Sequence, residues 1–264
     1  MSFASSARAR AAPASSNAFR RMAPTRRIAF VAGVLFIITF VTSIPALYLY
    51  QPVLDDPAAY IAGSGADSRI YLGAFLELLL IVANIGTAIV LFPVLRRQSE
   101  ILALGWVTAR LVESAFIAVG ILSVLAIVSL QQYAANAGAG SLAVVLAAIK
   151  DWTFLLGPGF VVGIGNGLLL GYLMYASGLV PRRLAMLGML GGTLICASGV
   201  LVLFGVAQQG GALQAVATVP EFIWELSLGI YLTVHGFRPC PILSEETPGD
   251  VVIGRQQVAA AVAS

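Results

Sequence analysis

IYLGAFLELLLIVANIGTAIVLFPVL, residues 70–95, decides the fold of this chain. As a helix it is long enough to cross the ~30 Å hydrocarbon layer of a membrane, which takes about 20 residues. It carries one charged side chain, Glu77. A run so long and so apolar predicts a transmembrane helix.

Five further runs of this kind flank it. The six predicted spans are 28–50, 70–95, 101–130, 152–177, 184–207 and 216–236. Backbone groups left without partners in lipid are costly, and continuous apolar runs favour helices over the alternating strands of a membrane β-barrel. The sequence therefore predicts an all-α, polytopic membrane bundle of six transmembrane helices.

The composition supports the same class. Charged residues make up 10% and hydrophobic residues 59% of the 264 residues, and mean hydropathy is +0.93. So few charges cannot coat a soluble globule, so the lipid bilayer is the expected partner. The net charge of +3 comes largely from arginines that precede the first span, and no nucleic-acid surface is expected.

The connections predict the orientation of the bundle. Arginines occupy the region before the first span (six of them), the turn at 96–97 and the turn at 182–183. All three positions fall on one face, which the positive-inside rule makes cytoplasmic. We expect a multi-pass protein of the cell (plasma) membrane with both termini inside. Residues 1–27 would form a basic disordered tail, 28–236 the membrane domain and 237–264 a cytoplasmic tail, and Met22 is an alternative start to Met1.

A stripe of glycines marks the fourth span. Gly159, Gly163, Gly167 and Gly171 recur every four residues, which places them on one helical face and lets a neighbouring backbone approach closely. The stripe is interpreted as packing against the fifth span, with a homodimer contact as the alternative. Gly157, Pro158 and Gly159 predict a break between this span and a short helical piece at 141–149.

Ionisable residues inside the spans carry the functional signal. They are Glu77, Arg110, Glu113, Glu221 and Glu225. Helical spacing puts Arg110 with Glu113 on one face and Glu221 with Glu225 on another. Because each charge at the bilayer centre costs about 2.5–3.5 kcal/mol on insertion scales, such residues persist only when they find partners inside the bundle. The second, third and sixth spans are expected to meet around one polar centre.

Charge counting leaves two interpretations of that centre. One guanidinium faces up to four carboxylates, and the surplus must be protonated or balanced by a bound cation or by water. The cluster is either a site for a proton, a cation or a small cationic ligand in a binding or transport module, or an ion-paired knot that fixes helix packing in a regulatory or scaffold partner. Lys150, Asp151 and Trp152 are expected as anchors at its outer mouth, and Tyr50 in the aromatic belt at the membrane surface.

Catalytic and cofactor signals are weak. His235 is the one histidine, and Cys196 and Cys240 stand alone, so no metal site and no cofactor is expected. The glycines around Asn166 lack nucleotide-loop spacing. Acid–base chemistry by paired carboxylates stays open, although an enzyme is not the favoured interpretation.

Several segments resemble a bacterial multi-pass membrane family known as domain of unknown function 4386. The matching pieces are AGVLFIITF at 32–40, SIP at 43–45, LRR at 95–97, RLVES at 110–114, FIWEL at 222–226 and GFRP at 236–239. The resemblance covers about residues 27–239. It implies a six-helix membrane fold and assigns no activity.

Overall fold

A computed structural model describes residues 23–63, 67–133 and 138–243. Most of both predicted tails, at 1–22 and 244–264, therefore lies outside the described residues. The first helix begins at Pro24, within the predicted N-terminal tail, and includes Arg26. Proline at the first helical position needs no amide donor there, which explains this start.

The six predicted spans are confirmed, and all are helical. They are α2 (Pro24–Asp55), α4 (Asp67–Leu95), α5 (Glu100–Leu130), the continuous segment Ala139–Ser177, α8 (Arg182–Leu203) and α9 (Ala212–Val234). The shorter elements are α3 (Pro57–Ala62), η1 (Gln131–Tyr133) and η4 (Pro241–Leu243). The described residues contain no strand.

The fourth span differs from the prediction. α6 (Ala139–Phe154) runs directly into η2 (Leu155–Val161), η3 (Gly163–Leu170) and α7 (Gly171–Ser177), so Pro158 does not separate two helices. η2 and η3 are π-helical. The wider π turn accommodates the proline ring and its missing amide, which would break a regular α-helix. Residues 141–149 therefore belong to the same continuous helical segment.

The six spans form a closed ring. Each packs on its neighbours in sequence, and α9 closes the ring against α2. Large apolar side chains such as Val82, Ile89 and Leu122 are about two-thirds exposed on the outside. In a soluble protein such a surface would aggregate, whereas here it is suited to contact lipid.

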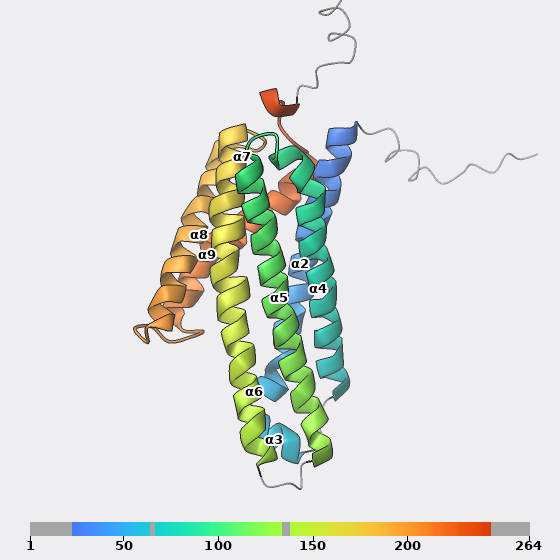
Figure 1. The fold of residues 1–264 in the computed structure, drawn as a ribbon, viewed down its shortest axis with the longest axis vertical. Coiled ribbons are helices and arrows are strands. Elements are labelled where there is room, and N and C mark those ends of the chain that lie inside the picture. Colours follow the sequence, from blue (N-terminus) through green and yellow to red (C-terminus); the bar gives the residue numbers. More distant parts are fainter. Residues whose placement is uncertain (1–22, 64–66, 134–137, 244–264) are drawn as a thin grey trace, which may run out of the picture.

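The two ends of the ring differ. Both ends of the described chain lie at one end, with the α4–α5 and α7–α8 turns (Figure 1). We call this the arginine-rich end, after Arg96, Arg97, Arg182 and Arg183 in and beside those turns. Arg26 donates hydrogen bonds to three carbonyl oxygens at the end of α9 there, which fixes α2 to α9.

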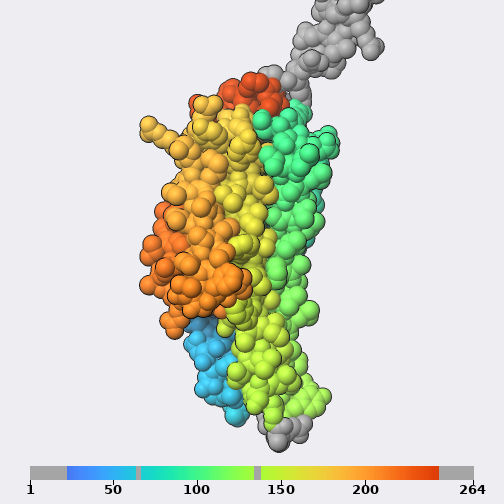
Figure 2. All heavy atoms as spheres, turned by 60° about the vertical axis from the view of Figure 1, so that its left-hand side comes forward, coloured from blue at the N-terminus to red at the C-terminus, as the bar shows by residue number. Residues whose placement is uncertain are grey.

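At the opposite end the α8–α9 hairpin stops early, while α6 and the α2–α3 region continue past it (Figure 2). A second apolar cluster, which includes Tyr60, Ile70 and Ile127, packs α3 against these longer helices. Gln209 in the α8–α9 turn donates a 2.7 Å hydrogen bond to the carbonyl oxygen of Asp151. The turn therefore lies level with Asp151, about a third of the way along the Ala139–Ser177 segment.

Candidate functional site

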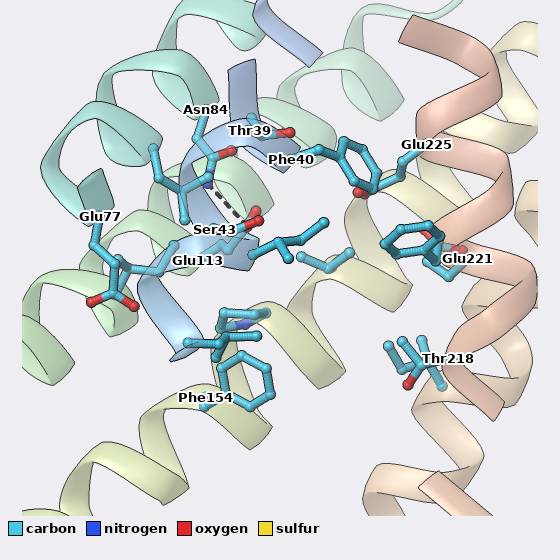
Figure 3. Close-up of a pocket in the computed structure, with 18 of the residues that line it drawn as sticks. Thr39, Phe40, Ser43, Glu77, Asn84, Glu113, Phe154, Thr218, Glu221 and Glu225 are labelled. Atoms are coloured by element: carbon cyan, nitrogen blue, oxygen red, sulfur yellow. Dashed lines mark hydrogen bonds between the residues drawn. The ribbon is translucent and has the colours of Figure 1, made fainter. Parts of the chain in front are cut away.

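A cavity of about 240 Å³ lies inside the ring. All six spans contribute side chains to it, with Thr39, Asn84, Glu113, Phe154 and Ile195 among them. Figure 3 shows Asn84 and Glu113 on one side of this cavity and Glu221 and Glu225 of α9 on the other. Most of the wall is apolar, so the few polar groups define what the cavity can bind.

Arg110, Glu113 and Asn84 form a closed hydrogen-bonded triangle. Arg110 Nη1 donates to Glu113 Oε2 at 2.7 Å, and Arg110 Nη2 donates to Asn84 Oδ1. Asn84 Nδ2 completes the triangle by donating to Glu113 Oε1 at 3.0 Å. All three residues are buried. The single guanidinium is therefore paired with Glu113, and the pair is neutral.

Asn166 connects this region to α9. It lies in the π-helical segment η3 and is fully buried. Its Oδ1 accepts a 2.9 Å hydrogen bond from Trp106 Nε1, and its Nδ2 donates to Glu225 Oε1. Its backbone oxygen accepts from Trp224 Nε1 at 3.0 Å. π turns are frequent at functional sites, and here one holds an amide against a carboxylate in mid-membrane.

Glu221 stands apart from every other buried acid. The residue is 2% exposed, and neither carboxylate oxygen has a hydrogen-bond partner among the described residues. It sits where Gly167 and Gly191 leave room for it: a Cβ atom on either glycine would come within 2.8 Å of Glu221 Oε2. A buried carboxylate without donors is costly, so Glu221 needs a partner that the chain does not supply.

Glu77 belongs to a different group of charges. Its two oxygens accept hydrogen bonds from Lys150 Nζ at 2.6 and 2.8 Å, and Tyr50 donates to it at 3.0 Å. Lys150 and Tyr50 are buried, which corrects the expectation that both lie at the membrane surface. Lys150 neutralises Glu77, so this acid has its own cation within the polar centre expected from the sequence.

The two groups occupy different depths. Glu77 and Asn84 are two turns apart on α4, which separates them by about 10 Å. Lys150 adjoins Asp151, which is level with the α8–α9 turn. We call Tyr50, Glu77 and Lys150 the Lys150 group. Asn84, Arg110, Glu113, Asn166, Glu221 and Glu225 form the Arg110 group, which lies deeper and contains three carboxylates for one cation.

The glycine stripe faces α8 at three of its four positions. A Cβ on Gly167 would collide with the backbone of Gly192, and one on Gly163 would lie 2.5 Å from Ile195. Gly171 likewise faces Ala185 and Met189 of α8. At Gly159 the nearest atoms belong to Phe154 and Leu155 of the same helical segment. The close approach of the two helices therefore depends on Gly163, Gly167 and Gly171, the three glycines nearer the arginine-rich end.

A groove of about 360 Å³ adjoins the cavity. Phe154, Pro158, Ile195, Thr218 and Phe222 line both. The groove continues along α9 to Gln214 and Gly210 at the α8–α9 turn. In the other direction, the apolar cluster that contains Phe36, Trp106 and Trp224 packs the arginine-rich half of the bundle. The cavity thus adjoins a groove that runs toward the α8–α9 turn.

All five ionisable residues singled out from the sequence line the cavity. The sequence analysis missed Lys150 and Asn166 as members. Lys150 adjoins Asp151, a pattern that is typical of an interfacial anchor, and Asn166 lies within a glycine-rich run. Asn166 is an amide in the middle of an apolar span, and that was the available signal. Among the described residues, no group of three or more His, Cys, Asp or Glu side chains could hold a metal ion.

Comparison with known proteins supports the fold and leaves the activity open. No curated protein and no solved structure matches the chain. Residues 31–236 match the family described as domain of unknown function (DUF4386). This range includes most of α2, the other five spans and every residue of both charge groups. The chain, a six-span membrane bundle, belongs to this family.

Proposed function

We propose that this protein is a membrane-embedded binding and transport module for a proton or a small monovalent cation, with Glu221 and Glu225 as the binding carboxylates. The observation that carries the proposal is the buried Glu221 carboxylate, which has no hydrogen-bond donor among the described residues. Arg110 is already paired with Glu113. When both are ionised, Glu221 and Glu225 leave two negative charges in an apolar cavity.

A positive partner would balance this excess. A proton on one carboxylate, or a cation between the two, removes the cost of isolated charge at this depth. The two acids are one helical turn apart on α9, so a single ligand can contact both. A divalent metal is a poorer fit, because it favours about six oxygen ligands and the cavity supplies few.

The orientation belongs to the same proposal. The arginine-rich end also carries both ends of the described chain (Figure 1), and positive residues favour the cytoplasmic side. In this orientation, within the plasma membrane, the groove beside α9 opens toward the outside. A cation would reach Glu221 from that side.

The test is flux into proteoliposomes. An entrapped pH dye reports protons, and radioactive sodium or rubidium reports inorganic cations. We expect flux by the wild type and flux at the level of empty vesicles for Glu221→Gln and Glu225→Gln. Glu100→Gln is the matched control, since Glu100 is an exposed carboxylate at the start of α5. Wild-type vesicles that conduct nothing, or equal flux in all four proteins, would contradict the proposal.

A further inference from the structure

Resting on the cation site just proposed, we propose in addition that its ligand is a small amphiphilic amine: a protonated primary or secondary ammonium with an apolar tail. The ammonium would bind Glu221 and Glu225, and the tail would lie in the groove along α9.

Glu221 lacks hydrogen-bond donors in the described part of the chain. Both oxygens of Glu221 are without one among the described residues, and Asn166 supplies Glu225 at Oε1. A primary ammonium brings three N–H donors on a single positive charge. A quaternary ammonium or a bare alkali ion brings charge without any donor. The vacant acceptors therefore favour a protonated amine with N–H groups.

The walls suit an organic group. Phe40 and Phe222 meet edge to face, with ring centroids 5.0 Å apart, and both line the cavity. Ile44, Ile117 and Phe154 add further apolar surface. A hydrated inorganic ion gains nothing from such walls, whereas methylene groups gain free energy by leaving water, and an ammonium is attracted to aromatic faces.

The groove offers a binding surface for the apolar tail of the amine and a route into the cavity. Val219, Phe222 and Phe154 line it and are 51%, 42% and 41% exposed on the lipid-facing surface. An amphiphilic amine concentrates at the membrane interface with its charge outward. From there it can enter head first beside α9, near the α8–α9 turn. The cavity itself, at 240 Å³, falls below the roughly 300 Å³ of a typical ligand pocket, so the ligand must be small.

Equilibrium dialysis of the purified protein in lipid nanodiscs tests this ligand class, with empty nanodiscs subtracted. The probes are radiolabelled n-hexylammonium and methylammonium at pH 7, where both amines carry a proton, and 1-hexanol as a neutral competitor. Each buried methylene strengthens binding by about fourfold, so two buried methylenes suffice for a preference of more than about tenfold. We expect hexylammonium to bind at least about tenfold more tightly than methylammonium, and hexanol to compete poorly.

Three variants locate the two parts of the ligand. Glu221→Gln should abolish binding of both amines. Val219→Ala, at the exposed rim of the groove and outside the cavity lining, should weaken hexylammonium binding and leave methylammonium binding unchanged. Glu100→Gln should bind like the wild type.

The outcomes separate this inference from the proposed function. If methylammonium binds as tightly as hexylammonium and Glu221→Gln removes both, the amphiphilic ligand is wrong and the cation site stands. If neither amine binds while proton or sodium flux still depends on Glu221, the amine ligand is again wrong and the proposed cation site stands. If neither amine binds and no flux depends on Glu221, both proposals fail.

Discussion

Two groups of buried charge lie in one bundle, about 10 Å apart along α4. In the Lys150 group, one ammonium meets one carboxylate, and the hydroxyl of Tyr50 adds a further donor to the same acid. In the Arg110 group, one guanidinium meets three carboxylates, of which Glu113 alone is paired with it. The first group is electrically complete, and the second is not.

This difference indicates which buried charges are structural and which are candidates for ligand binding. A complete pair needs nothing from outside, and its main effect is to hold two helices together. An acid that is buried without donors persists only if something else offsets its cost. Burial alone does not separate the two cases, because Glu77 and Glu221 are 5% and 2% exposed. The hydrogen-bond partners of each carboxylate distinguish the paired acid from the unpaired one.

Breaking the Lys150 group should have the largest effect on stability. Lys150→Met leaves Glu77 buried without its cation, and we expect a loss of about 3–5 kcal/mol in the free energy of unfolding. The measurement is reversible unfolding in mixed detergent micelles. The double variant Lys150→Met with Glu77→Gln carries no buried charge at this place and should recover most of the loss. A single variant as stable as the wild type would show that the pair is not needed.

A smaller effect is expected where the Arg110 group meets the glycine stripe. Gly167→Ala forces a methyl group against the backbone of Gly192 and against Glu221, and should destabilise the protein by about 1–3 kcal/mol. Gly159→Ala is the matched control, since its Cβ would meet ordinary van der Waals contacts. Thermal unfolding of both variants measures the difference. Equal stability of the two would contradict the close approach of η3 and α8.

The smallest expected effect concerns the third member of the Lys150 group. Tyr50→Phe removes one donor to Glu77 while Lys150 remains in place, and should cost about 1–2 kcal/mol. Tyr48→Phe serves as the control, because Tyr48 is exposed. Unfolding of the two variants under the same conditions provides the comparison. A loss as large as that of Lys150→Met would mean that the hydroxyl, rather than the ammonium, holds Glu77.

Sequence reasoning reached the fold more fully than the site. Long apolar runs predict spans directly, because lipid tolerates few other structures, and all six were found. Pairs on one helix, such as Arg110 with Glu113, also follow from spacing. Contacts between residues on different helices do not follow from the spacing of residues in the sequence. Lys150 reaches Glu77 across 73 positions in sequence, and only the rotation of the two helices in the ring decides that contact.

The π-helical turns were also beyond sequence reasoning. Gly157, Pro158 and Gly159 are typical of a break, and the pattern does not show that wider turns can carry the helix through them. Without that continuity, the positions of Lys150 and Asn166 on one long segment could not be foreseen. Both of the overlooked polar residues belong to this span.

The central claim is that Glu221 is an acid without a partner in the chain, whereas Glu77 is a paired one. The most direct test is the free energy of unfolding of Glu221→Gln beside that of Glu77→Gln, measured without added ligand. We predict that Glu221→Gln is as stable as the wild type or more stable, and that Glu77→Gln loses about 3–5 kcal/mol because Lys150 is left unpaired. A Glu221→Gln variant that loses as much as Glu77→Gln would show that the chain itself satisfies Glu221, and would contradict the account.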